Sequence, residues 1–253
     1  MDFFKNQFAE ISDSFNKTFI VDKRWLMLLK GLGVTLEITV VAAVLGIIIG
    51  FIIAGVRSTY DMNFAGKKAK NFGGFLMKFF NAICNLYLTV IRGTPVVIQL
   101  MIIYFIVFAD MRNGIYAAFV AFGINSGAYV AEIVRSGIMS IDKGQFEAGR
   151  SLGLNYIQTM WHIIFPQALK NILPALGNEF IVLVKETSIA GYVALQDITY
   201  IGNLIRSRTY EAFFPLVTVA LIYLAVVMIL SYFLNKLERR LRGNEHRTNI
   251  DQS

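Results

Sequence analysis

The sequence has few of the residues from which disulfide bonds and metal sites are built. Cys84 is the only cysteine among 253 residues, which excludes a disulfide within the chain and any cysteine-rich metal site. His162 and His246 are the only histidines, too few for a typical zinc site. We therefore expect no bound metal, and the sequence offers no cluster of catalytic side chains.

Charge is also scarce. Only 16% of the residues are charged, 56% are hydrophobic, and the mean hydropathy is +0.57. Soluble domains contain about 25% charged residues, so this composition indicates an integral membrane protein. The net charge of +7 could suit nucleic acid, but cytoplasmic loops of membrane proteins also collect Lys and Arg. We favour a lipid bilayer and no nucleic acid as the partner.

Five apolar segments approach the length of about 20 residues that a membrane-spanning helix needs. They cover residues 38–56, 93–109, 113–131, 170–187 and 212–235. The predicted fold is all-α and integral to the membrane, with about five transmembrane helices. We divide the chain into a polar, amphipathic N-terminal segment (1–30) without a cleavable signal pattern, a transmembrane domain (31–240) and a polar tail (241–253).

One apolar segment, residues 75–91, is interrupted by Lys78, Asn81 and Asn85. We interpret it as an interfacial helix on the cytoplasmic side that turns at residues 93–95 into the second span. The alternative is a single long, broken helix over residues 75–109. Residues 197–210 are expected to form a short amphipathic element outside the membrane.

The distribution of basic residues predicts an orientation. If residues 142–166 lie inside the cell, 15 of the 24 Lys and Arg residues fall in inside loops and 8 outside. This excess follows the positive-inside rule, although the basic N-terminal segment opposes it. We expect a multi-pass protein of the cytoplasmic (inner) membrane, with its N-terminus outside and its C-terminus in the cytoplasm.

The polar stretch from 142 to 166 carries signals for two short helices. Asp142 and Gln145 have the spacing of a capping box, and Gly153 suits a left-handed helix stop. Asn155 and Gln158 repeat the box, and Pro166 marks the start of the fourth span. These signals alone fit an ordinary cytoplasmic loop as well as a docking surface.

The same stretch resembles the EAA loop of binding-protein-dependent ABC importer permeases. The residues that carry the resemblance are Glu147-Ala148-Gly149, Gly153, Ile163 and Phe165-Pro166. Gly149 replaces the third alanine of the pattern and Phe165 replaces a leucine. A glycine in a helix costs up to about 1 kcal/mol relative to alanine.

Other motifs resemble the polar amino-acid permease subfamily, which includes histidine, glutamine and arginine permeases. Together they extend the resemblance over residues 31–236. They are Arg92-Gly93-Thr94-Pro95 with Gln99, Tyr129 to Arg135, Lys143-Gly144-Gln145, Asn178-Glu179-Phe180 and Lys185-Glu186-Thr187-Ser188.

The resemblance implies a type I ABC importer permease, a transporter subunit rather than an enzyme. Two permease subunits, identical or related, would pair around a two-fold axis and bind two copies of an ATPase and an extracytoplasmic amino-acid-binding protein. ATP and Mg²⁺ would bind the ATPase and no cofactor would bind this chain, which lacks a G-x-x-x-x-G-K-[ST] loop. Coupling to the ATPase is assigned to the coupling loop (140–166), through Lys143, Gln145, Glu147, Ala148, Gly149, Arg150 and Gly153.

Polar residues within the predicted spans are candidates for binding the solute, because an ionisable group in a membrane is costly. Glu179 lies about 13 Å beyond Lys170 along a helix, near the membrane midplane. We expect Glu179 to accept the ammonium group of an amino acid, and Gln99 or Asn125, beside Ser126, to donate to its carboxylate. A structural hydrogen bond across a subunit interface is an equally open reading for Glu179.

Further ionisable residues near the span ends are candidates for gating or structure. Glu132 and Arg135 are one turn apart at the inner end and are expected to form an ion pair, and Arg92 belongs to the same group. Lys185 and Glu186 flank the outer end, where Thr187 would begin an outer gate loop over residues 189–192. The competing functions are a non-transporting membrane scaffold and a permease for a different small polar solute. The sequence does not select one amino acid, and it fits both a homodimer and a heterodimer.

Overall fold

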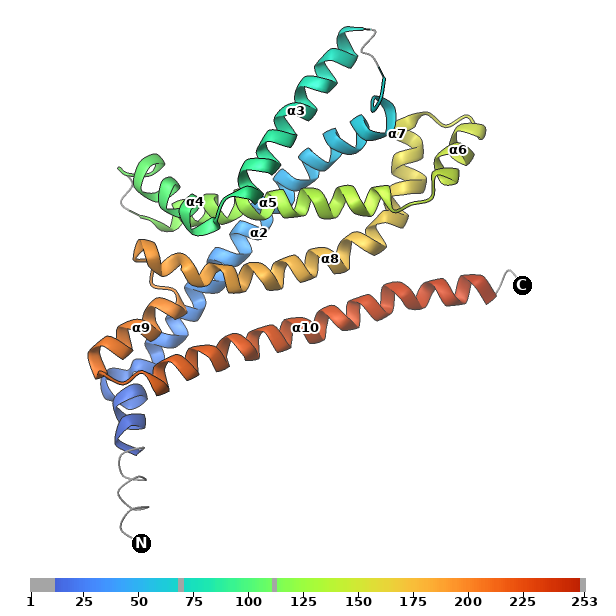
Figure 1. The fold of residues 1–253 in the computed structure, drawn as a ribbon. Helices are drawn as coiled ribbons and strands as arrows, with labels where there is room; N and C mark the ends of the chain where they lie inside the picture. Colours follow the sequence, from blue (N-terminus) through green and yellow to red (C-terminus); the bar gives the residue numbers. More distant parts are fainter. Residues whose placement is uncertain (1–11, 68–70, 111–112, 251–253) are drawn as a thin grey trace.

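The computed structural model describes residues 12–67, 71–110 and 113–250, with the backbone alone for 242–250. All regular structure in these residues is helical (Figure 1). Four helical stretches are long and apolar enough to cross a membrane: Ser12–Asn63, Phe72–Gly93, Ile115–Met139 and Phe213–Leu241. A fifth helix, α8 (Phe165–Glu186), lies between the others with a similar length. The predicted all-α fold with about five spans is confirmed.

The centre of the fold is the contact between α2 (Arg24–Asn63) and α5 (Ile115–Met139). Small residues recur every four positions on the buried face of α2: Ala42, Gly46, Gly50 and Ala54. A Cβ atom on Gly50 would lie 2.4 Å from Cγ1 of Val130, so the two backbones can approach this closely only because Gly50 has no side chain. This small-xxx-small spacing is typical of packed membrane helices.

The second apolar region forms two helices separated by a break. Helix α3 (Phe72–Gly93) is followed by Thr94 and Pro95 in extended conformation, and then by α4 (Val96–Ile102) and the π-helical turn η3 (Ile103–Val107). Proline disfavours a helical conformation in the residue before it, which accounts for the position of the break. The expectation of a second span at 93–109 is wrong, because α3 has the length of a span and Val96–Val107 is shorter. The predicted turn at residues 93–95 is present, whereas the interfacial position expected for residues 75–91 is wrong, because α3 has the length and hydropathy of a span.

Helices α5, α8 and α10 (Phe213–Ile250) run side by side in alternating directions (Figure 1). A short linker between α5 and α8 contains α6 (Lys143–Ser151), α7 (Tyr156–Thr159) and the π-helical turn η4 (Met160–Ile164). Buried residues of α5, η4 and α8 form a continuous core there: Val130, Val134, Ile138, Ile164, Ala168 and Ile172. Phe165 and Pro166 begin α8, as predicted from Pro166.

The opposite end of the bundle contains η1 (Asn16–Ile20), η2 (Val21–Lys23), η5 (Thr187–Val193) and α9 (Ile198–Thr209). Leu28, Ile198, Ile201, Ile205 and Val219 hold α9 between α2 and α10. The predicted short amphipathic element at 197–210 is therefore a helix. The outer gate stretch at 189–192, expected to be a loop, lies within the 3-10 helix η5, so that expectation is wrong.

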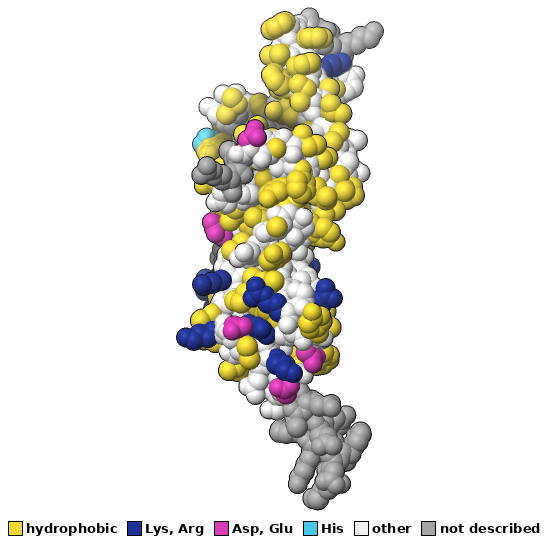
Figure 2. All heavy atoms as spheres, turned by 90° about the vertical axis from the view of Figure 1, so that its left-hand side faces the viewer, with side chains coloured by type: hydrophobic (Ala, Val, Ile, Leu, Met, Phe, Trp, Pro, Cys, Tyr) yellow, Lys and Arg dark blue, Asp and Glu magenta, His cyan; other side chains and the backbone are white. Residues whose placement is uncertain are grey.

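Figure 2 shows this end of the bundle face on, with Lys and Arg side chains gathered over part of it. Exposed basic residues of the terminal elements are Lys23, Lys30, Lys185, Arg206 and Arg208. The flanks are apolar: on α10, Leu221, Leu224 and Met228 are all more than half exposed. Charged ends and apolar flanks fit helices whose axes cross a bilayer. The division at residues 30 and 240 remains a prediction, and both positions lie inside continuous helices.

Candidate functional site

The predicted helix pair of the coupling loop is present, with one difference in its capping. The Asp142 carboxylate accepts a hydrogen bond from the Gly144 amide at 2.6 Å, and α6 runs for nine residues. Gly153 has a φ of +79°, the predicted left-handed stop. Asn155 and Gln158 form the predicted reciprocal capping box. Gln145 does not complete a box with Asp142; its side-chain oxygen lies 3.4 Å from Nε2 of Gln167.

Gly149 fixes the distance between α6 and α7. It is buried, and a Cβ atom there would lie 2.6 Å from Cγ2 and 2.8 Å from Oγ1 of Thr159. Thr159 is itself buried, and its hydroxyl has no hydrogen-bond partner among the described residues. The glycine that departs from the EAA pattern is thus matched to the neighbouring threonine, a contact that the sequence alone did not reveal.

One face of α6 borders a cavity of about 310 Å³ at the C-terminal ends of α2 and α5. Lys143, Phe146, Glu147 and Arg150, spaced as one helix face, line one side of it. The opposite side is formed by Asp61, Met62, Met139, Ile141 and Tyr156. The Tyr156 hydroxyl lies 3.4 Å from the Thr59 hydroxyl, which ties α7 to α2. Glu147 and Arg150 of the predicted coupling set therefore face a space between α6 and the helix bundle.

The four polar residues expected in the solute pocket form two pairs. Ser126 Oγ donates to the Glu179 carboxylate at 3.0 Å, and Asn125 Nδ2 donates to Gln99 Oε1 at 3.1 Å. Because Asn125 and Ser126 are consecutive residues of α5, both pairs lie at the same level along that helix. Ser126 pairs with a residue of α8, and Asn125 pairs with a residue of α4. The structure brings the predicted residues to one level of the bundle.

Gln99 is already engaged in structural hydrogen bonds. Its Nε2 donates to the carbonyl of Ile91 at 2.7 Å and lies within 3.1 Å of the Thr94 carbonyl and 2.8 Å of the Thr94 hydroxyl. These bonds connect the two sides of the helix break. Asn125 Oδ1, in contrast, is a buried acceptor with no partner among the described residues. The geometry favours Asn125 over Gln99 for contact with a ligand, and as an acceptor rather than a donor.

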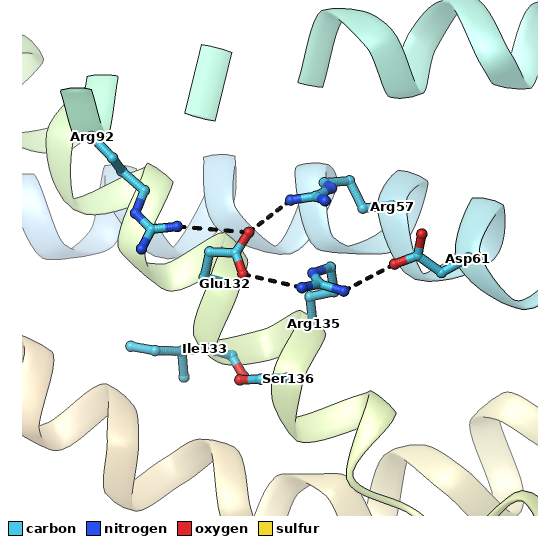
Figure 3. Close-up of polar contacts among 7 residues, drawn as sticks. All are labelled: Arg57, Asp61, Arg92, Glu132, Ile133, Arg135 and Ser136. Atoms are coloured by element: carbon cyan, nitrogen blue, oxygen red, sulfur yellow. Dashed lines mark hydrogen bonds and ion pairs between the residues drawn. The ribbon is translucent and has the colours of Figure 1, made fainter. Parts of the chain in front are cut away.

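Toward the C-terminal ends of α2 and α5, the ends predicted to lie inside, five charged residues form what we call the inner charge cluster: Arg57, Asp61, Arg92, Glu132 and Arg135 (Figure 3). Glu132 contacts Arg57 at 2.7 Å, Arg135 at 3.3 Å and Arg92 at 3.8 Å. Arg135 also binds Asp61 at 3.0 Å. The predicted Glu132–Arg135 ion pair is present, within a network that joins α2, α3 and α5.

Arg57 and Asp61 were missed at the sequence level. Arg57 ends an apolar segment and appeared to be an ordinary inside basic residue. Its spacing of four from Asp61 on α2, matched by the spacing of three between Glu132 and Arg135 on α5, was the available signal. Two opposite-charge pairs on facing helices are consistent with partners across the helix contact.

The predicted outer residues do not form a comparable network. Thr187 is fully buried and donates to the Val184 carbonyl at 2.7 Å, Lys185 is exposed, and Glu186 lies at the junction of α8 and η5. The prominent outer contact is at Asp197, whose carboxylate accepts from the amides of Thr199 and Tyr200 at 3.0 Å each. Burial raises the pKa of the Asp197 carboxyl group, and these backbone amides oppose the rise. The Ile198 amide donates to the Thr35 hydroxyl at 3.2 Å, which joins α9 to α2.

Comparison with known proteins assigns the family. Residues 70–243 match the model of the binding-protein-dependent transport system inner membrane component family. The chain belongs to this family. It is 38% identical over 221 residues to the arginine transport system permease protein ArtQ of Bacillus subtilis, covering 86% of this chain and 94% of the relative. It is also 38% identical to the glutamine transport system permease protein GlnP of Escherichia coli K12, covering 85% and 93% of the two chains.

Two solved structures have the same fold. A crystal structure of an amino acid ABC transporter with histidines superimposes with a TM-score of 0.75 at 38% identity, over 87% of this chain and 96% of the other. An inward-facing MetNI methionine ABC transporter gives a TM-score of 0.71 at 21% identity, over 86% and 97%. These likenesses confirm the predicted type I ABC importer permease architecture. As a member of this family the chain is a membrane protein and a transporter subunit.

Proposed function

We propose that this chain is the membrane-spanning subunit of an ATP-driven importer for polar or charged amino acids. The observation that carries the proposal is the carboxylate of Glu179, held by Ser126 inside the helix bundle at the level of Asn125. Two permease relatives of this chain are named for arginine and glutamine transport. An ammonium group is common to all amino acids and matches this carboxylate.

The proposed solute site uses Glu179 as the acceptor for the ammonium group and the free Oδ1 of Asn125 as a second acceptor. Ser126 orients Glu179, and Gln99 orients Asn125 through the 3.1 Å hydrogen bond. A second permease subunit, identical or related, pairs with this chain and completes the pathway.

The proposed topology places the N-terminus outside and the C-terminus in the cytoplasm. Helices α2, α5 and α10 then run inward and α8 runs outward, which brings α6 to the cytoplasmic side. Two copies of an ATPase, which hold ATP and Mg²⁺, dock one on each permease subunit, at α6 and its neighbours: Lys143, Gln145, Glu147, Ala148, Arg150 and Gly153. Gly149 contributes by fixing the position of α6 against α7. An extracytoplasmic binding protein delivers the amino acid to the opposite end.

The proposed gates lie at the two ends of the pathway. At the inner end Arg92, Glu132 and Arg135 hold α3 and α5 together through the inner charge cluster. At the outer end Lys185, Glu186 and Thr187 occupy the junction between α8 and η5, where a movement of η5 would change the opening.

The test is uptake by the complete complex of permease, ATPase and binding protein in liposomes. We expect ATP-dependent uptake of labelled arginine, glutamine or histidine, and competition among those that share the site. If no amino acid is taken up and none stimulates ATP hydrolysis, a scaffold role is supported. If the complex takes up only another small polar solute, the chain is a transporter subunit but amino acids are not its solutes.

A further inference from the structure

The cavity behind α6 is connected directly to the inner charge cluster. Glu147 and Phe146 of α6 form one wall, and Asp61 at the inner end of α2 forms part of the opposite wall. Oδ2 of the same Asp61 binds Arg135 at 3.0 Å. A shift of α6 against α2 therefore changes the surroundings of Asp61, the residue of the cluster that lines this cavity.

Within the cluster, a change at Asp61 reaches Glu132 through a shared arginine. Arg135 binds Asp61 with Nη1 and Glu132 with Nη2 (Figure 3). The side chains of Asp61, Glu132 and Arg135 are each about one quarter exposed (26%, 26% and 27%). Charges at partly buried positions interact more strongly than surface pairs, because water screens them less.

Glu132 also binds two other arginines, and they are held unequally. Arg57 is 2.7 Å away and its side chain is 16% exposed, whereas Arg92 is 3.8 Å away and 44% exposed. Arg92 has a second partner, the ring of Tyr129 at 5.6 Å. Three arginines share two carboxylates, so the cluster has one positive charge in excess. The Arg92–Glu132 contact is the one that separates at the lowest cost.

Arg92 lies next to the helix break that leads to the proposed solute site. It is the penultimate residue of α3, and Thr94 and Pro95 follow in extended conformation. Gln99 bridges this break to Ile91 and Thr94, and its Oε1 accepts from Asn125. Arg92 is therefore joined to Asn125 through the helix break and Gln99.

We propose that Asp61, Arg135, Glu132 and Arg92 form a relay that transmits movement of α6 to Asn125, and that the Arg92–Glu132 contact is its release point. The relay rests on the proposed transport function. Asp61 and Arg92 act in it as positioning residues, since neither contacts the solute. The links from Asp61 through Arg135 and Glu132 to Arg92 are side-chain contacts. At one end of the relay α6 faces Asp61 across the cavity, and at the other Gln99 joins the end of α3 to Asn125.

The test is a double-mutant cycle with Asp61→Asn and Arg92→Gln in the complete complex in liposomes. The quantity measured is the number of amino acid molecules taken up per ATP hydrolysed. Each single variant is expected to lower this ratio roughly five- to tenfold, the lower range of allosteric couplings, while ATP hydrolysis continues. The double variant should be no worse than the more affected single variant, because both interrupt the same path.

Two further variants separate the relay from a general loss of structure. Arg92→Lys retains the charge and should keep at least half of the wild-type ratio, because the 3.8 Å contact is not a bidentate hydrogen bond. Lys236→Gln removes an exposed positive charge from the inner part of α10 and should leave the ratio unchanged.

Three outcomes would overturn the relay: wild-type ratios in both single variants, additive losses in the double variant, or Arg92→Lys as defective as Arg92→Gln in an assembled complex. Failure of the proposed function is a different result. In that case the wild-type complex itself shows no uptake and no solute-stimulated ATP hydrolysis.

Discussion

Gly149 is unfavourable for helix formation, yet the packing around it leaves no room for a larger residue. Helix propensity alone favours alanine at this position by up to about 1 kcal/mol. The structure places Cγ2 of Thr159 at 2.6 Å from where the alanine methyl group would lie. Overpacking of this kind typically costs about 1–3 kcal/mol, so the steric term outweighs the propensity.

We therefore predict that Gly149→Ala destabilises the α6–α7 pair. The melting temperature of the detergent-solubilised complex should fall by a few degrees, since about 1 kcal/mol corresponds to roughly 2–4 °C for a chain of this size. The added methyl group should also push α6 away from α7, so the ATPase should bind less tightly.

The control for this prediction is the double variant Gly149→Ala/Thr159→Ala. It removes both Thr159 atoms within 3 Å and deletes a buried hydroxyl that has no hydrogen-bond partner among the described residues. It should recover the wild-type melting temperature. A Gly149→Ala variant as stable as wild type would show that α6 and α7 can separate freely.

Glu179 is the residue on which the proposed solute site depends. Glu179→Gln keeps the shape and the hydrogen bond from Ser126 but removes the negative charge that would neutralise an ammonium group. We predict that uptake falls at least tenfold while the permease and ATPase still assemble, as measured by size-exclusion chromatography and transport in parallel. Normal uptake by this variant would assign Glu179 a structural role only.

Among the helices, the ends of the coupling-loop pair were predictable because local chemistry determines them. Asp142, Gly153 and the Asn155–Gln158 box act within a few residues of themselves, and the structure has all of these signals. Helix α3 was not predicted as a span because Lys78, Asn81 and Asn85 lower its local hydropathy. Asn81 is buried against neighbouring helices and Lys78 is half-buried, a tertiary effect that a hydropathy scan does not include.

Helix α9 depends on its N-terminal cap. Asp197→Ala removes the acceptor for the amides of Thr199 and Tyr200 and should cost about 1 kcal/mol, the usual loss for an N-cap. Asp197→Asn should lose less than the alanine variant but still be destabilised, because asparagine has one acceptor oxygen where Asp197 uses both carboxylate oxygens. Thermal unfolding of the two variants checks this prediction. Equal stability of the alanine variant and wild type would show that packing against Leu28 and Val219 suffices to hold α9.

At the scale of the whole molecule, the class of fold and the depth of the polar residues along the helices could be predicted from the sequence. The residues with which they pair on other helices could not. Asn125, Ser126 and Glu179 could be placed near one depth by counting residues along helices. The pairing of Arg57 with Glu132 joins positions 75 apart, and it depends on how α2 and α5 face each other. The glycines that set that contact, Gly46 and Gly50, have spacing that suggests packing but not a particular partner helix.

The orientation of the molecule is open to direct measurement. In a Cys84→Ser background, Ser207→Cys on α9 should react with a membrane-impermeant maleimide added to intact cells. Ser151→Cys on α6 should react only after the membrane is opened, because the proposed topology places α6 inside. Both serines are exposed in the single chain. The reverse labelling pattern would invert the topology and remove α6 from the ATPase.

The central claim is that α6 of this chain converts ATP hydrolysis by a partner into movement of an amino acid across the membrane. The most direct test is the ratio of amino acid taken up to ATP hydrolysed, compared between the wild-type complex and Glu147→Lys in liposomes. Glu147→Lys reverses the charge on the face of α6 that borders the cavity. Wild-type complex should show solute-stimulated hydrolysis and a constant ratio, and the variant should lose uptake through uncoupled hydrolysis or a loosened ATPase. Wild-type coupling in Glu147→Lys would contradict the account.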